Sequence, residues 1–437
     1  MPHWWKGCVK RMKVLKILGV GVFTLMLVSL CLFGLDYVLS DDSKSYARIQ
    51  MHELYEQEDI DSLFLGASHV YSGLNPAVTD EVWNQNTFSC STSSQRINTS
   101  YALLKEADKV ADIDTCYLEM SAKGVTKEVG EGLLDEVYRV ADYLKPSWNR
   151  VSYLLNAVPS EQYVNAFWRT RRNWKSIYSL SKMKRTISNK RTEAYKNYEY
   201  ATDTEHYVGK GFIHFTAEFN NVAIGIREPI KNPVSEDYRH YFQKTVEYCR
   251  ENDIKLICFG IPLCEFTMET IGNYDVYYKE AKELCEQYGV PYYDFNLANP
   301  AILDLQDNDF RDVNHLNAAG AEKFSRVFAE FFAGKIDEEK LFYDSYEQKR
   351  NHLTKRFIGL ALKRDKSSKF CEIRPITTKE DDYEYEVYYE DENKDYILLQ
   401  EKSPNLKIAM PKKEKTRLKI RIFDSKGNKV AGFVKSV

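Results

Sequence analysis

The sequence predicts an α/β protein: a parallel sheet with helices on both faces, preceded by a transmembrane helix and followed by a small all-β module. Three observations lead to this prediction. A long uncharged apolar run lies near the N-terminus, short apolar runs alternate with helix-compatible segments in the middle, and apolar and polar residues alternate near the C-terminus. The length of 437 residues, 43% of them hydrophobic, is enough for two or three domains.

The apolar run spans residues 17–35, and its 19 residues are close to the roughly 20 that cross the hydrocarbon core of a membrane. The flanking charges are Lys6, Lys10, Arg11, Lys13 and Lys16 before it and Asp36, Asp41 and Asp42 after it. Because the positive side stays in the cytoplasm, we expect residues 1–42 to form a cytoplasmic tail and a single-pass anchor, with the rest of the chain extracytoplasmic. A cleaved signal peptide is the alternative, but the run is long for one and lacks a small-x-small site.

Residues 43–335 have the strand and helix rhythm of an α/β domain. The expected strands are Ser62 to Leu65, Asn86 to Ser89, Thr115 to Met120, Lys255 to Ile261 and Pro291 to Phe295. The expected helices are Ser94 to Val110, Ser235 to Asn252, Tyr274 to Tyr288 and Ala318 to Phe332. Sites in parallel sheets form beyond the carboxyl ends of the strands, so we expect the functional residues at one edge of the sheet.

Three residues of this domain predict nucleophilic catalysis. Ser68 follows the first expected strand in a tight turn that begins at Gly66, and a serine nucleophile needs a base and a group that orients the base. Asp312 lies three residues before His315, ahead of the last expected helix. With this spacing Asp312 can fix the tautomer of His315 while the other imidazole nitrogen faces Ser68.

With these motifs the chain resembles the SGNH (GDSL-type) hydrolase superfamily. The sequence Leu-Gly-Ala-Ser-His, followed by Gly-Leu-Asn-Pro, is similar to membrane-anchored bacterial members related to the DltD proteins of teichoic-acid D-alanylation and to polysaccharide O-acetyltransferases. The resemblance covers residues 46–335. It implies a flavodoxin-like sheet (the SGNH hydrolase fold) and a serine acyl-enzyme that needs no metal and no organic cofactor.

The resemblance also implies an oxyanion hole formed by the backbone N–H groups of Ser68 and of a second-block glycine, a position that Ser94 occupies here. A backbone donor survives that change. The third block of the superfamily usually supplies an Asn, where this chain offers Glu119 and Ser121. A missing oxyanion donor costs about 2.7 to 4 kcal/mol, and the candidate substitute is Gln95.

Each of these residues also has an ordinary structural interpretation. A Gly-x-Ser after a strand is most often a simple turn, and Asp312 could cap the following helix. For His69, beside the nucleophile, we expect a side chain that points away along the turn. The order and separation of the motifs favour the triad of Ser68, Asp312 and His315.

The rhythm breaks in an insertion at residues 123–234, which is partly helical and rich in aromatic residues. Between Arg169 and Arg191 it has nine basic residues and no acidic one. These are Arg169, Arg171, Arg172, Lys175, Lys182, Lys184, Arg185, Lys190 and Arg191. The two interpretations are a solvated helical face and a contact with anionic lipid headgroups or an anionic envelope polymer.

Residues 336–369 indicate a helical linker, and residues 370–437 indicate a β-rich accessory module, a sandwich. The expected strands of the module are Tyr383 to Tyr389, Tyr396 to Leu399, Leu406 to Met410, Leu418 to Phe423 and Val430 to Val434. Its candidate glycan-binding aromatics are Tyr383, Tyr385, Tyr388 and Tyr389, although a packing or spacer role fits the pattern as well.

The seven cysteines outside the anchor region indicate neither zinc nor a disulfide framework, because they form no Cys-x-x-Cys motif and no Cys/His cluster. Several, including Cys116 and Cys258, lie in apolar runs, so we expect buried thiols.

We therefore expect an extracytoplasmic, membrane-anchored serine acyl esterase or O-acyltransferase. Its expected partners are a cell-envelope glycan or teichoic-acid-type polymer, the lipid bilayer and a membrane protein that donates the acyl group. The net charge of −3 gives no indication of a nucleic-acid partner. The alternative from another class is a non-catalytic glycan-binding or envelope-assembly protein that retains the fold.

Overall fold

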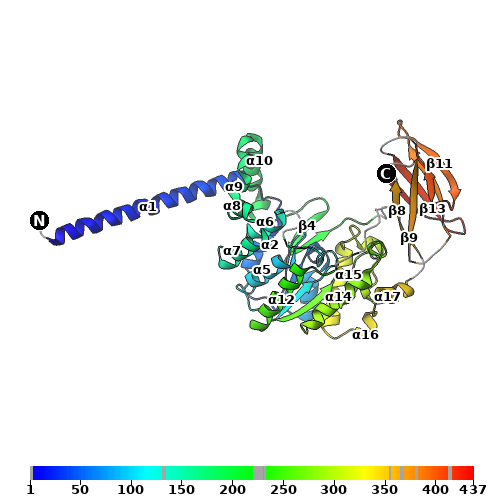
Figure 1. Cartoon of the computed structure of the whole chain (residues 1–437), viewed down its shortest axis with the longest axis horizontal. Coiled ribbons are helices and arrows are strands. Elements are labelled where there is room, and N and C mark those ends of the chain that lie inside the picture. The colour runs from blue at the N-terminus through cyan, green and yellow to red at the C-terminus, as the bar shows by residue number, and fades with distance from the viewer. Residues whose placement is uncertain are drawn as a thin grey trace. The chain divides into compact units, whose positions relative to one another are not determined.

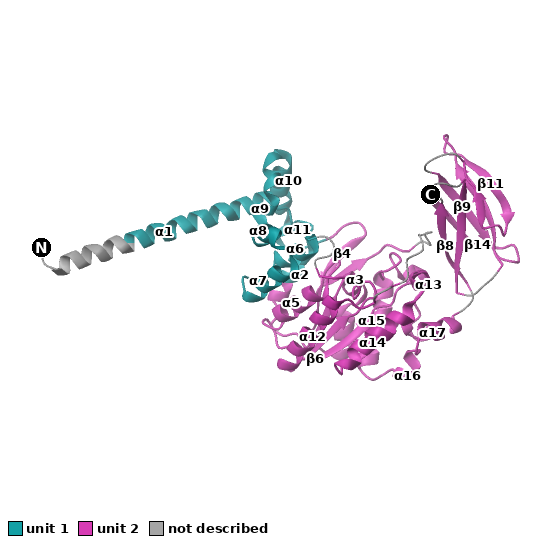
Figure 2. Cartoon of the chain, in the orientation of Figure 1, with its two compact units in different colours: residues 1–52, 132–200 teal, residues 53–131, 201–437 magenta. Residues whose placement is uncertain are grey.

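The computed structural model describes residues 3–129, 134–219, 230, 233–353, 356–364, 369–378, 382–411 and 416–437 (Figure 1). The chain folds as two compact units (Figure 2). Unit 1 combines residues 1–52 with 132–200, and unit 2 combines residues 53–131 with 201–437. Much of the expected insertion at 123–234 therefore folds with the N-terminal helix, and part of it lies outside the described residues.

The described part of unit 1 contains helices and no strand. Its helices are α1 His3–Leu39, α2 Tyr46–Tyr55, which runs into unit 2, α6 Asp135–Ala141, α7 Trp148–Ala157, α8 Tyr163–Phe167, α9 Arg169–Asn173, α10 Leu180–Lys190 and α11 Glu193–Lys196, with short 3₁₀ turns at Ser160–Gln162 and Trp174–Tyr178. Within α1, the stretch Lys16–Leu39 is long and apolar enough to cross a membrane, and its apolar window is not buried within the protein. A membrane span and a signal sequence both meet this description.

The centre of unit 2 is a five-stranded parallel sheet. Its strands are β1 Ser62–Gly66, β2 Thr87–Ser91, β3 Thr115–Glu119, β6 Lys255–Gly260 and β7 Tyr292–Asp294, in the order β2-β1-β3-β6-β7. All five expected strands are confirmed to within about two residues at each end. When the five strands are numbered in chain order, their order in the sheet is 2-1-3-4-5, which is that of flavodoxin-like sheets. In such a sheet the second strand lies on one side of the first strand, and the third lies on its other side.

Helices cover both faces of this sheet. Neighbouring side chains of a strand point to opposite faces, and Leu63, Phe64 and Leu65 of β1 are all fully buried. The helices of unit 2 are α3 Ser68–Gly73, α4 Pro76–Trp83, α5 Ile97–Ala107, α12 Glu236–Glu251, α13 Glu265–Ile271, α14 Tyr274–Gln287, α15 Ala318–Phe332, α16 Glu338–Leu341 and α17 Tyr346–His352. Helix α15 packs on α4, and α5 packs on α12.

Local sequence signals set the bounds of these helices. Helix α12 begins after Ser235, whose hydroxyl accepts a hydrogen bond from the N–H of Tyr238, and α15 begins after Asn317, whose side chain accepts one from Gly320. The expected helix at residues 318–332 has the observed bounds of α15. A hairpin of β4 Glu205–Gly209 and β5 Phe212–Phe215 packs beside α3.

The C-terminal part of unit 2 is a β-sandwich, as predicted. One sheet has the order β11-β10-β13-β14 and the other β12-β9-β8, and inward side chains of both form one core. The strands are β8 Phe357–Arg364, β9 Phe370–Thr377, β10 Glu384–Glu390, β11 Tyr396–Ser403, β12 Lys407–Ala409, β13 Arg417–Phe423 and β14 Lys429–Ser436. Because β8 pairs with β9, strand structure begins inside the expected linker at residues 336–369.

Two of the tyrosines expected to bind glycan are core residues instead. Tyr383 and Tyr385 are 7% and 2% exposed and pack in the sandwich core. Tyr385 lies on β10 and Tyr383 directly precedes this strand, and their spacing of two residues turns both side chains to its inner face. Tyr388 and Tyr389 are half-buried, so the four tyrosines do not form one exposed aromatic surface.

The thiols are buried, as expected. Outside the anchor, the described cysteines are Cys90, Cys116, Cys249, Cys258, Cys264, Cys285 and Cys371, all buried and free.

Candidate active site

The candidate nucleophile stands at the carboxyl end of β1. The strand ends at Gly66, and Ser68 is the first residue of helix α3. A Cβ atom at Gly66 would come within 2.3 Å of Val70 Cγ2 and 2.6 Å of Glu119 Oε2, so only glycine fits there. Close packing at Gly66, rather than an unusual backbone angle, therefore fixes the turn that carries Ser68.

The structure brings the three predicted catalytic residues together in unit 2. The Ser68 Oγ lies 2.7 Å from His315 Nε2. The other ring nitrogen of His315, Nδ1, lies 2.8 Å from Asp312 Oδ1 and 2.9 Å from Asp312 Oδ2. A hydroxyl, an imidazole and a carboxylate in this order can pass a proton away from the serine.

The loop before α15 holds the imidazole and its carboxylate in place. Asp312 Oδ1 accepts hydrogen bonds from the backbone N–H groups of Asn314 and His315, and the N–H of Arg311 donates to the carbonyl of His315. The cap of α15 is Asn317, so Asp312 does not have the helix-capping role considered as its alternative.

Burial and neighbouring charges set the protonation of this pair. Burial would raise the pKa of Asp312, but the hydrogen bonds from His315 and Asn314 and the charges of His315 and Arg311 outweigh it and lower the pKa to about 2. Burial lowers the pKa of His315, and its interaction with Asp312 only partly opposes this effect. At neutral pH the carboxylate is therefore charged and the imidazole is neutral, as a general base must be.

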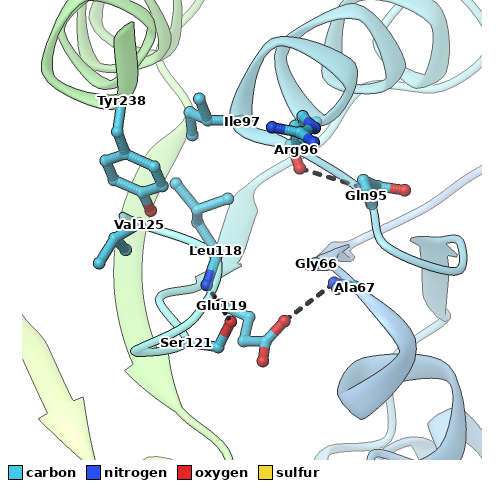
Figure 3. A pocket seen from close by; sticks show the side chains of 12 residues that line it. Gly66, Ala67, Gln95, Arg96, Ile97, Leu118, Glu119, Ser121, Val125 and Tyr238 are labelled. Atoms are coloured by element: carbon cyan, nitrogen blue, oxygen red, sulfur yellow. Dashed lines mark hydrogen bonds between the residues drawn. The ribbon is translucent and has the colours of Figure 1, made fainter. Parts of the chain in front are cut away.

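A second imidazole and carboxylate lie beside the first pair. His69 Nδ1 is 2.8 Å from Glu119 Oε1, and the rings of His69 and His315 are 4.9 Å apart at their centroids. Glu119 Oε2 accepts a hydrogen bond of 2.8 Å from the N–H of Ala67, and Figure 3 shows this contact. The expectation that His69 points away along the turn is wrong, because Glu119 at the end of β3 holds its ring in the site.

The backbone of Ser94 differs from that of ordinary residues. Its φ of 58° is in the left-handed region, which a glycine adopts without strain. This is the position at which the resembling superfamily has glycine. In the described part of the chain, the N–H groups of Ser68 and Ser94 have no hydrogen-bond acceptor, and both residues line the same cavity.

The side chain of Gln95 is not available as the oxyanion donor that the sequence suggested. Its Nε2 donates to the carbonyl of Cys90 at 3.1 Å and to Ser100 Oγ at 3.0 Å, and its Oε1 accepts from Thr92 Oγ1. Both amide hydrogens are therefore used in bonds that hold the loop after β2. Figure 3 shows Gln95 beside Arg96 on the loop that leads into α5.

The cavity above Ser68 has a volume of about 240 Å³. Ser68, His69 and His315 are among the residues that line it. The lining also includes the cationic side chains Arg96, Lys123 and Lys127 and, among the described residues, no carboxylate. A second cavity, of about 20 Å³, is lined by Gly66 and Glu119 among others (Figure 3) and has room for one water molecule.

Sequence reasoning missed the pairing of His69 with Glu119. The two residues are 50 positions apart in the chain. The available signal was that His69 follows one expected strand and Glu119 lies near the end of another, and neighbouring parallel strands bring their carboxyl ends to one edge. Strands β1 and β3 are such neighbours.

Comparison with known proteins does not assign this chain to a family. No family model matches the chain, and no curated protein matches it. Among solved structures, one that is similar is a double mutant of the Cellulomonas fimi endo-beta-1,4-mannanase, with 9% sequence identity and a TM-score of 0.15. That likeness covers 91% of this chain and 99% of the mannanase chain, and a TM-score this low does not indicate a shared fold.

Proposed function

We propose that this protein is a membrane-anchored, extracytoplasmic serine acyl esterase or O-acyltransferase of the SGNH type that acts on an anionic cell-envelope polymer. One observation carries the proposal, namely the continuous contact from Ser68 through His315 to Asp312 at the carboxyl edge of a parallel sheet. The flavodoxin-like strand order and the left-handed Ser94 at the expected glycine position support the resemblance to that superfamily.

In this proposal Ser68 Oγ attacks an ester carbonyl while His315 Nε2 takes its proton. The imidazolium so formed is stabilised by the Asp312 carboxylate and returns the proton to the leaving alcohol. The resulting acyl-enzyme is released by water in an esterase, or by a hydroxyl of the polymer in a transferase. The two outcomes use the same residues and differ only in the acceptor.

The developing oxyanion would be stabilised by the backbone N–H groups of Ser68 and Ser94. His69 takes the place of the absent Asn as third donor. Its Nδ1 contacts Glu119, so its Nε2 is the atom left for the cavity, where it has no protein partner among the described residues. Because Nδ1 contacts the Glu119 carboxylate, Nε2 can donate to an oxyanion only while both ring nitrogens carry a proton.

The lining of the cavity favours an anionic acceptor. Arg96, Lys123 and Lys127 contribute positive charge without a carboxylate among the described lining residues, so phosphate or carboxylate groups of a polymer would be attracted. A teichoic-acid-type polymer fits this better than a neutral glycan does.

Contacts of the segment that follows the apolar run favour an uncleaved anchor. Asp42 is buried and lies 3.0 Å from Arg169 Nη2 and 3.3 Å from Lys190 Nζ. Cleavage within residues 36–42 would remove partners that unit 1 uses in its fold. The charge asymmetry around the run then orients the N-terminus toward the cytoplasm.

The test uses the full chain in detergent micelles or nanodiscs. Hydrolysis of p-nitrophenyl acetate and labelling by a serine-reactive phosphonate are followed for the wild type, Ser68→Ala and His315→Ala. The matched control is Ser121→Ala, which removes another serine that lines the cavity. We expect turnover and labelling in the wild type and control, and neither reaction in the two triad variants.

A wild type that is folded, shown by its circular dichroism spectrum, yet neither turns over nor takes the label contradicts the proposal. In that case the non-catalytic glycan-binding alternative becomes the better hypothesis.

A further inference from the structure

The carboxyl end of α1 is held in a polar socket formed by helices α9 and α10 of unit 1. Arg169 reaches Asp36 at 3.8 Å and Asp42 at 3.0 Å, and Asn173 donates to Ser40 Oγ at 3.0 Å. From α10, Asn189 donates to Asp41 Oδ2 at 3.0 Å. These contacts fix α9 and α10 beside the point at which the apolar helix ends.

The segment around this socket exposes many large apolar side chains, which we name the apolar collar. Its members are Val164, Phe167, Trp168, Trp174, Ile177, Tyr178 and Leu180. Tyr178 and Leu180 are 76% and 71% exposed. In a helical unit surrounded by water, the helices would turn large apolar side chains of this kind toward a core.

The basic residues of the same segment divide into two groups. Arg169, Arg172 and Lys190 are used within unit 1, in ion pairs with Asp36, Asp42 and Asp142. The other six are exposed and are Arg171, Lys175, Lys182, Lys184, Arg185 and Arg191. The solvated-face interpretation of the basic run is thus incomplete, because three of its cations form ion pairs within unit 1 and two of these, Arg169 and Lys190, hold the end of α1.

Exposed aromatic residues, exposed cations and the end of a membrane-length apolar helix occur together in one unit. Trp and Tyr concentrate at membrane interfaces because their rings are apolar at one end and polar at the other. Lys and Arg beside them are attracted to anionic headgroups. An anionic polymer in solution would bind the cationic side chains but would leave the apolar side chains exposed to water.

We propose that residues 164–191 lie in the headgroup region of an anionic lipid leaflet, so that the collar holds unit 1 on the membrane where α1 emerges. This rests on the proposed membrane anchoring of α1. It is independent of catalysis at Ser68.

The experiment places the full chain in nanodiscs and measures quenching of tryptophan fluorescence by lipids brominated close to the headgroup. The collar variant combines W4F, W5F, W83F and W148F, which leaves Trp168 and Trp174 as the only tryptophans. The matched control combines W4F, W5F, W148F, W168F and W174F, and keeps Trp83, which is packed in unit 2 and donates to the carbonyl of Ala329. Discs of phosphatidylglycerol and of phosphatidylcholine are compared.

We expect strong quenching of the collar variant, greater in phosphatidylglycerol discs, and little quenching of the control. Replacing Lys175, Lys182, Lys184 and Arg185 by Gln should remove the difference between the two lipids while leaving quenching in place. Full emission from Trp168 and Trp174 in discs that retain the protein would overturn the proposal. Failure of the protein to enter discs would instead overturn the anchoring of α1, and equal quenching in both lipids would overturn the preference for anionic headgroups.

Discussion

Two imidazole–carboxylate pairs lie beside Ser68. They have the same kinds of side chain but differ in the sequence separation of the partners and in the burial of the carboxylate. In the first, His315 and Asp312 are three positions apart, and the Asp312 side chain is 45% exposed. In the second, His69 and Glu119 are 50 positions apart, and the Glu119 side chain is 2% exposed. The first directs a ring nitrogen at the serine hydroxyl. The second holds the backbone just before the serine.

This difference indicates that the position of the carboxylate in the fold determines the chemical role of the imidazole it binds. Asp312 sits on the same loop as His315, so the pair can accept and return a proton without disturbing the sheet. Glu119 ends a central strand and also binds the N–H of Ala67, so the carboxylate is locked into the turn that carries the nucleophile. We infer a general base in the first pair and a fixed hydrogen-bond donor in the second.

The largest effect is expected from breaking the first pair at its imidazole. His315→Ala removes the general base, and we expect kcat for p-nitrophenyl acetate to fall on the order of 10⁵-fold, as for Ser68→Ala. Because the two residues act as one unit, the double variant should be no slower than either single one. Additive losses in the double variant would show that the two do not form one catalytic chain.

Asp312→Asn should reduce kcat by about 10²- to 10⁴-fold, because a neutral amide neither stabilises the imidazolium nor fixes the tautomer. Asp312 also raises the pKa of His315, so its loss should move the ascending limb of the pH–rate profile to lower pH. The profile of kcat/KM against pH measures this shift. An unchanged ascending limb would show that Asp312 does not influence the pKa of the group whose titration controls activity.

Glu119→Gln and His69→Gln should each lower kcat by about 10²-fold, with the double variant close to the single ones. The charge of His69 lowers the pKa of His315, so His69→Gln should move the ascending limb to higher pH, opposite to Asp312→Asn. Shifts in the same direction in both variants would show that the two pairs do not play different roles.

In the wild type, activity should fall as pH decreases through the pKa of His315, since the imidazolium cannot accept the proton of Ser68. Burial lowers this pKa from the ordinary value of 6.5, so the midpoint should lie below 6.5. Asp312, with a pKa of about 2, stays ionised throughout that range. A midpoint above 6.5 in the pH–rate profile would contradict the buried, neutral base.

The smallest effect is expected at Ser94, which serves the site with its backbone. Ser94→Gly should relieve a left-handed conformation worth about 1 to 2 kcal/mol, offset in part by added freedom of the unfolded chain, and should leave kcat unchanged. Urea denaturation measures the gain. Ser94→Ala is the control, because alanine keeps the strain and should show no gain.

The elements that depend on local signals were the most predictable. Helix α15 has the expected bounds because Asn317 caps it and its apolar face repeats with the helical period. Strand β1 followed from its apolar run. The tyrosines of β10 and the one just before it were harder to assign, because alternation predicts two faces but not which of them is buried. Tyr383 and Tyr385 lie on the buried face.

The candidate site and the basic segment likewise have features that the sequence predicted and features that only the fold shows. Gln95 was a reasonable oxyanion donor by sequence, yet its amide is used by Cys90 and Ser100, partners that only the folded loop reveals. The basic run was visible as charge, but only the fold separates the cations of the socket from those at the surface.

The sequence by itself predicted the five strands of the parallel sheet, helix α15 and the apolar N-terminal helix, and it pointed to Ser68, Asp312 and His315 as candidates, because each of these signals lies in residues that are neighbours along the chain. Tertiary structure alone decided that His69 meets Glu119, that Arg169 and Lys190 hold the end of α1, and that the apolar collar stays exposed. The physical reason is that these features depend on which strand ends and helix faces become neighbours in space. Periodicity and composition do not encode those pairings.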